Sequence, residues 1–153
     1  MFPNTTISRT DLARSTRQAL EQARRGQTVL VASYGEEQVA IIDALDYRLL
    51  RAAAFYRARR DAPDPTAIPQ GLSAETVATA VAQAQEDPQV AWDLVIATYL
   101  DGHISLGRAA ELLRLSRFDL TTRFNRLELP LRLGVDSPAE VQAEVEALRD
   151  LDN

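Results

Sequence analysis

A proline-rich segment divides this chain of 153 residues into two parts. Residues 61–71 read DAPDPTAIPQG, with three prolines and one glycine in eleven residues. Each proline removes a backbone donor and disfavours helix at the residue before it, so no regular element is expected to continue through this stretch. We therefore expect two domains, residues 1–60 and residues 72–153, joined by the linker 61–71.

The two parts differ strongly in charge. Residues 1–60 hold ten arginines against six acidic residues, a net charge of +4, whereas residues 61–153 hold seven arginines against sixteen acidic residues, a net charge of −9. This contrast predicts different partners for the two parts. The chain has no cysteine, and we find no signal peptide and no long apolar run, so we expect a cytoplasmic protein without a membrane partner.

The first part begins with a strand pattern and a helix pattern. Residues 5–8 are short and rich in β-branched side chains, which favours a strand. Thr10 is the expected N-cap of one continuous helix, because apolar residues recur at helical spacing from there to Ala23. Gly26 then suits the left-handed conformation that often ends a helix.

A hairpin pattern follows the helix. Residues 28–32 and 38–42 have strand character on either side of the turn 33–37, and an arginine-rich helix is expected from Asp46. The predicted order is β-α-β-β-α. A unit of ~60 residues buries too little surface to be stable alone and leaves sheet edges open, so we expect a homodimer through residues 1–60.

The first part resembles the Phd/YefM antitoxin family over about positions 5–50. The resemblance is carried by Ile7-Ser8, Asp11 to Arg14, Ala19-Leu20, Gly26 to Val29, and Gly35 before the sequence Ala-Ile-Ile. It implies a dimeric DNA-binding module that represses its own operator, with Arg14 facing the DNA. Some relatives also carry an arginine at the hairpin, where this chain has Ser33 and Tyr34.

Arginines and small hydroxyl side chains gather where this first helix is expected to begin. Arginine binds guanine edges and phosphates, and hydroxyl groups donate hydrogen bonds to phosphate. The alternative is that these side chains form only the solvated face of an amphipathic helix. The candidate DNA-binding residues are Ser8, Arg9, Thr10, Arg14, Ser15 and Arg17.

The second part reads as helices throughout. Helices are expected from the cap at Ser73, from Pro88, from the caps at Ser105 and Ser116, and from Ser137-Pro138 in the acidic C-terminal segment. The fold class is therefore α+β: a Phd/YefM-like domain followed by an all-α domain.

Positions 104–131 have the pattern of a helix-turn-helix. Small side chains at Ala109 and Ala110 precede a tight turn at residues 113–116, and a second helix follows. Residues 75–150 resemble a small helix-turn-helix family found in antitoxins beside PIN-type toxin genes. Because the acidic charge of this half opposes DNA binding, the pair is interpreted either as a DNA-binding unit or as a helical hairpin that builds a core or a protein interface. Candidate contacts to DNA or a partner are Arg117, Arg123 and Arg126.

The chain lacks the usual signatures of catalysis. It has a single histidine, His103, no cysteine, and none of the glycine-rich or nucleophile motifs for which we searched. We expect a non-enzyme without metal or cofactor. The leading interpretation is a type II antitoxin that binds operator DNA and neutralises a cognate toxin of the PIN-type endoribonuclease class. The alternative is a stand-alone transcriptional regulator with two DNA-binding units and no toxin.

Overall fold

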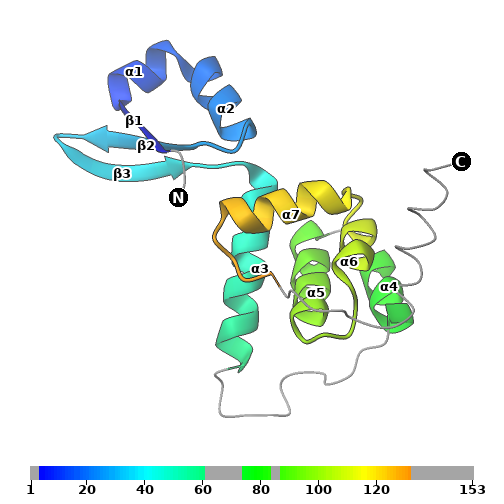
Figure 1. Cartoon of the computed structure of the whole chain (residues 1–153). Helices are drawn as coiled ribbons and strands as arrows, with labels where there is room; N and C mark the ends of the chain where they lie inside the picture. Colours follow the sequence, from blue (N-terminus) through cyan, green and yellow to red (C-terminus); the bar gives the residue numbers. More distant parts are fainter. Residues whose placement is uncertain (1–3, 61–73, 84–86, 132–153) are drawn as a thin grey trace, which may run out of the picture.

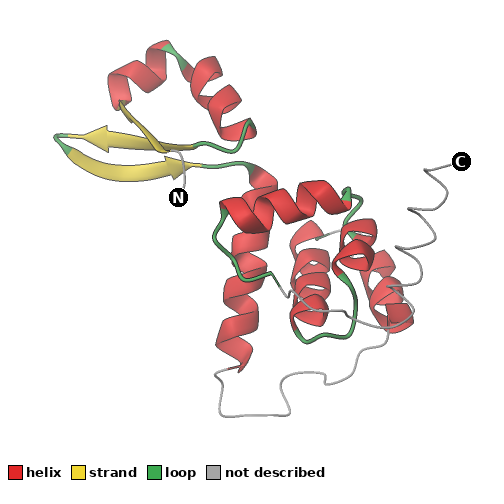
Figure 2. Ribbon diagram, viewed as in Figure 1, coloured by secondary structure: helices red, strands yellow, loops and turns green. Residues whose placement is uncertain are grey.

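The structure of the chain, a computed structural model, describes residues 4–60, 74–83 and 87–131. Within these residues the fold is mixed α+β, with one three-stranded sheet and seven helices (Figure 1; Figure 2). The elements are β1 (Asn4–Ser8), α1 (Arg9–Arg14), α2 (Thr16–Arg24), β2 (Thr28–Ser33), β3 (Glu36–Ile41), α3 (Ala44–Arg60), α4 (Ala74–Gln83), α5 (Pro88–Leu100), α6 (Leu106–Leu112) and α7 (Arg117–Arg126).

Two short helices replace the single helix expected after β1. The prediction of Thr10 as N-cap is wrong, because the Oγ of Ser8 accepts a hydrogen bond from the backbone N–H of Asp11 at 3.0 Å. The chain then bends at Ser15, and the hydroxyl of Thr16 donates to the carbonyl oxygen of Leu12 at 2.7 Å. Hydroxyl side chains that bond to nearby backbone compete with helix, which explains a break at this serine–threonine pair.

The sheet has the order β1-β2-β3, with β1 parallel and β3 antiparallel to the central strand β2. Val29 and Val31 of β2 are buried on one face. Figure 1 shows α1 and α2 on one side of the sheet, and both helices contact β2. Since cross-strand partners point to the same face, Ile41 and Val39 of β3 lie on the side of Val29 and Val31.

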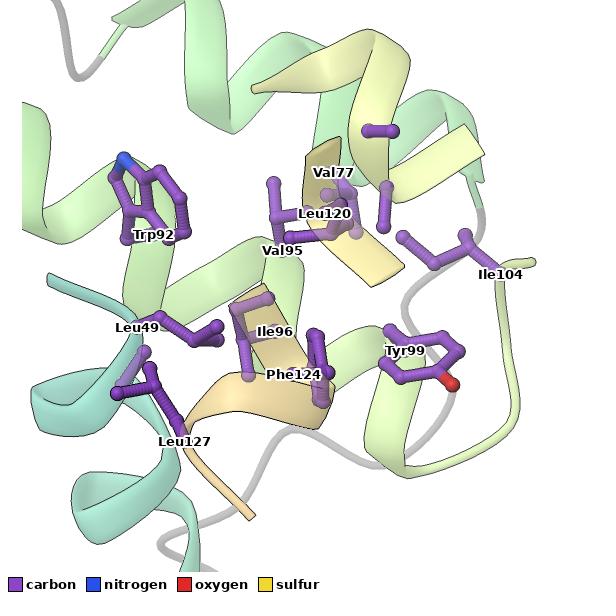
Figure 3. Packing of buried hydrophobic residues seen from close by; sticks show 13 residues of the cluster. Leu49, Val77, Trp92, Val95, Ile96, Tyr99, Ile104, Leu120, Phe124 and Leu127 are labelled. Carbon is purple, nitrogen blue, oxygen red and sulfur yellow. The ribbon is translucent and has the colours of Figure 1, made fainter. Parts of the chain in front are cut away.

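The main core lies away from the sheet, among helices. Leu49 and Ala52 of α3 are buried together with Ile96, Tyr99 and Phe124 from the helices of the second part (Figure 3). The rings of Tyr99 and Phe124 meet edge-on, with centroids 5.6 Å apart. The helix α3 follows the last strand of the sheet in the chain, but it packs against α5 and α7 of the second part.

The turn expected between the last two described helices is present. Ser105 caps α6 and Ser116 caps α7, each with its Oγ accepting a backbone N–H three residues on. Arg114 has a φ of 59° in the turn between them. Pro88 stands at the N-terminus of α5 as expected, after the cap Asp87.

Some expectations fall outside the described residues. These are the linker 61–71, the cap at Ser73 and the acidic helix expected after Ser137-Pro138. Among the residues that are described, no helix is long and apolar enough to cross a membrane.

Candidate nucleic-acid interface

The six candidate DNA-binding residues lie in one exposed stretch from the end of β1 to the start of α2. Arg9 opens α1, Arg14 ends it and Arg17 stands in the first turn of α2. Between the helices, Ser15 makes no side-chain cap for α2. The three arginines and Ser15 are thus all exposed within ten consecutive residues.

The arginines of this stretch form no ion pair within the part of the chain that the structure describes. Neither Arg9 nor Arg14 nor Arg17 forms an ion pair with another residue that the structure describes, whereas Arg25 at the far end of the helix pair bonds Glu21 at 3.2 Å. Exposed cations that are not paired with described residues are available to an external anion. We name the exposed stretch Ser8–Arg17 the arginine surface.

Ser8 has a structural task that limits its use in binding. Its hydroxyl caps α1 and also donates to a carboxylate oxygen of Asp11 at 2.9 Å. The backbone N–H of Asp11 is therefore already satisfied, and a negative charge stands beside it. Of the predicted residues, the arginines are better placed than Ser8 to bind an anion.

The hairpin turn lies at the same end of the sheet as the start of α1. Because β1 and β2 are parallel and Ser8 pairs with Ala32, both strands leave the sheet together, β1 into α1 and β2 into Tyr34-Gly35. Tyr34 is fully exposed and has a φ of 53°, a left-handed conformation in which glycine and asparagine are usual. The exposed ring of Tyr34 therefore lies at the same end of the sheet as Arg9, the first arginine of the arginine surface.

Two of the three candidate arginines in the second part are used inside the molecule. The Nη1 of Arg123 donates to Asp43 at 2.6 Å and to Asp46 at 2.5 Å. Arg126 bonds Asp46 through Nε at 2.9 Å and through Nη2 at 2.8 Å. Their side chains are 16% and 19% exposed, and that of Asp46 only 5%. Binding of a partner by either guanidinium would require an internal ion pair to break.

We call these four residues the α3–α7 ion cluster, since Asp43 precedes α3, Asp46 lies on it, and both arginines lie on α7. Burial lowers the pKa of Arg123, but its hydrogen bonds to Asp46 and Asp43 outweigh burial and raise the pKa above its ordinary value. Asp43 also accepts the backbone N–H groups of Leu45 and Asp46, which fixes the start of α3. The cluster joins the entry of α3 to α7.

Gly26 lets the side chain of Arg126, a member of this cluster, pack against the end of α2. A Cβ built at Gly26 would stand 2.5 Å from Cζ and 2.8 Å from Cδ of Arg126, closer than any side chain tolerates. Gly26 also has a φ of 89°, as expected of a residue just after a helix. The side chain of Arg126 therefore lies against the end of α2 while its guanidinium binds Asp46.

The third candidate, Arg117, has a different setting. It is exposed at the first position of α7, beside Phe118, which is 78% exposed. Asp119 follows, and its carboxylate accepts the hydroxyl of Ser116 at 2.9 Å. This end of α7 mixes one cation, one anion and one aromatic ring, so it fits a protein partner better than a polyanion.

Comparison with known proteins gives no relative from which a role could be transferred. No family model, no curated protein and no solved structure matches this chain significantly. Among the described residues, no group of three or more histidine, cysteine, aspartate or glutamate side chains could hold a metal ion.

Proposed function

We propose that the chain is a type II antitoxin that represses its own operon through the arginine surface and neutralises a cognate toxin through its second part. The observation that carries the DNA-binding half of this proposal is the set Arg9, Arg14 and Arg17, exposed together and without ion pairs to described residues. Such cations bind phosphates and guanine edges. The resemblance of residues 5–50 to the Phd/YefM family supplies the biological role.

A homodimer through residues 1–60 is part of the proposal. Strands β1 and β3 are the free edges of the sheet, and β3 is exposed over its first five residues. Leu20 of α2 is 50% exposed and Val39 of β3 is 58% exposed, on two elements that contact each other. A second copy covering these side chains would bury an apolar surface and present two arginine surfaces, as a palindromic operator requires.

The second part is proposed to bind the toxin rather than DNA. Arg123 and Arg126 are held by carboxylates of the same chain, and the exposed start of α7 carries Phe118. The acidic charge of this half suits a basic partner surface. The toxin class inferred from the resemblance is a PIN-type endoribonuclease.

The proposal is tested by expressing the gene adjacent to this one alone and together with this chain. We expect arrested growth with the adjacent gene alone, restored growth with both, and a complex that copurifies. An adjacent product that is harmless, or that forms no complex, would refute toxin neutralisation and favour the stand-alone regulator. Binding of this chain to the DNA upstream of its gene is expected both for an antitoxin and for a stand-alone regulator. It therefore tests the DNA-binding part of the proposal separately from toxin neutralisation.

A further inference from the structure

A groove of about 500 Å³ lies between the C-terminal half of α3, the end of α5 and the segment after α7. Its lining includes the apolar side chains of Ala53, Leu100, Phe124, Leu129 and Leu131. This volume is enough for several apolar side chains. The arginine surface lies on other elements, so the groove is a separate site.

Two cations line one side of this groove. Arg57 and Arg60 lie three residues apart on α3, so their side chains share a face about one helical turn apart. Both are exposed, and neither forms an ion pair with another described residue. Tyr56 also lines the groove, and its hydroxyl donates a hydrogen bond to the carboxylate of Asp101 at 2.8 Å. The groove is therefore chemically suited to an apolar segment with acidic side chains.

We propose that this groove binds the acidic C-terminal segment of the same chain, residues 138–151. In that sequence Val141, Val145 and Leu148 recur at helical spacing, which predicts an apolar stripe. Glu140 and Glu144 fall four residues apart along one flank of the stripe. Two carboxylates one turn apart thus match two guanidiniums one turn apart.

The path of the chain favours its own segment over one from elsewhere. Leu131 lines the groove and is the last residue that the structure describes. Only residues 132–137 separate it from Pro138, and six residues reach at most about 20 Å. A short tether of this kind gives an effective concentration in the millimolar range. Weak contacts are then sufficient for binding.

The pairing of groove and segment does not depend on the proposed antitoxin function. In the free protein, segment 138–151 would occupy the groove. A partner that binds the acidic segment would have to displace this segment from the groove. The partner's apparent affinity would then be reduced in proportion to the fraction of molecules in which the segment is docked. A failed toxin experiment and a failed groove experiment are therefore separate results.

Disulfide trapping tests the pairing in the full chain, which has no cysteine of its own. The test variant is Arg57→Cys/Glu144→Cys, which keeps Arg60 and Glu140. The matched control is Arg57→Cys/Glu146→Cys, because Glu146 falls on the other side of the predicted helix. Under mild oxidation we expect the test variant to form an intramolecular disulfide about tenfold faster than the control.

A second substitution separates docking from chance collision. Adding Arg60→Glu to the test variant should slow the disulfide severalfold, and adding Glu140→Arg as well should restore the rate. Equal rates in test and control variants would overturn the proposal, as would a rate indifferent to the charge reversal. A covalent dimer in place of the monomeric product would assign the groove to a second copy and overturn it too.

Discussion

At the scale of single residues, Asp46 has the most demanding position in the molecule. Its buried carboxylate accepts hydrogen bonds from two arginines, Arg123 and Arg126, that lie on another helix. A charge in such a place is tolerated only when its partners remain, since breaking a buried pair leaves an uncompensated ion. The Nε of Arg123 is buried without a hydrogen-bond partner among described residues, so the cluster has no spare contacts to replace a lost carboxylate.

We therefore expect Asp46→Asn to lower the free energy of unfolding by about 3 kcal/mol. Chemical denaturation of the wild type and the variant measures the difference. The matched control is Glu21→Gln, which removes the exposed ion pair with Arg25, where both side chains are more than half exposed. That substitution should cost less than about 0.5 kcal/mol. Equal effects of the two substitutions would contradict a structural role for the α3–α7 ion cluster.

At the scale of elements, the hairpin β2–β3 is closed by an unusual pair of residues. Tyr34 and Gly35 both have positive φ, at 53° and 80°, which is the pattern of a type I′ turn. Asparagine is favoured where Tyr34 stands, and the ring of Tyr34 makes no packing contribution because it is fully exposed. A residue that is poor for the turn and unused in the core points to a role in binding.

Tyr34→Asn should separate folding from binding. We expect stability to stay equal or to rise by up to about 1 kcal/mol, because asparagine relieves the left-handed strain. Affinity for operator DNA should fall severalfold, because the variant loses a tyrosine hydroxyl that can donate to a phosphate. Thermal unfolding and DNA-binding titrations on the same preparation give both values. Unchanged affinity would remove Tyr34 from the interface.

At the scale of the whole molecule, local patterns predicted the elements better than their grouping. The caps Ser105 and Ser116, the hairpin and the glycine after α2 follow from residues that act within a few positions of themselves. The linker 61–71 predicted that α3 belongs to the first part, yet Leu49 lies in the core shared with α5 and α7. Contacts between residues nearly eighty positions apart leave no local signal.

The candidate site shows the same division between local and distant information. The arginine surface was predicted because its residues are neighbours in sequence. The ion pairs of Arg123 and Arg126 were not, since nothing near them in sequence marks Asp43 and Asp46 as partners. Asp43 stands where a helix cap is usual, and Asp46 stands where a first-turn carboxylate is usual. These local roles account for both residues, so the sequence gives no sign of their contact with α7.

The proposed dimer makes a prediction about assembly. Val39→Glu places a charge on the exposed apolar side of β3 and should convert a dimer into a monomer, because the charge would be buried at the interface. Light scattering coupled to size exclusion measures the mass. As a control, Val90→Glu changes another exposed valine, 42% exposed on α5, and should leave the mass unchanged. A wild-type monomer, or a dimer that survives Val39→Glu, would contradict this interface.

The central claim is that the arginine surface binds operator DNA, and titration of the upstream DNA with Arg14→Ala tests it most directly. Arg24→Ala is the matched control, because it removes the same charge from the exposed last turn of α2. We predict that Arg14→Ala weakens binding about tenfold or more, as expected for one specific contact of about 1–3 kcal/mol, while Arg24→Ala has a smaller effect. Equal, small losses for the two folded variants would contradict the claim.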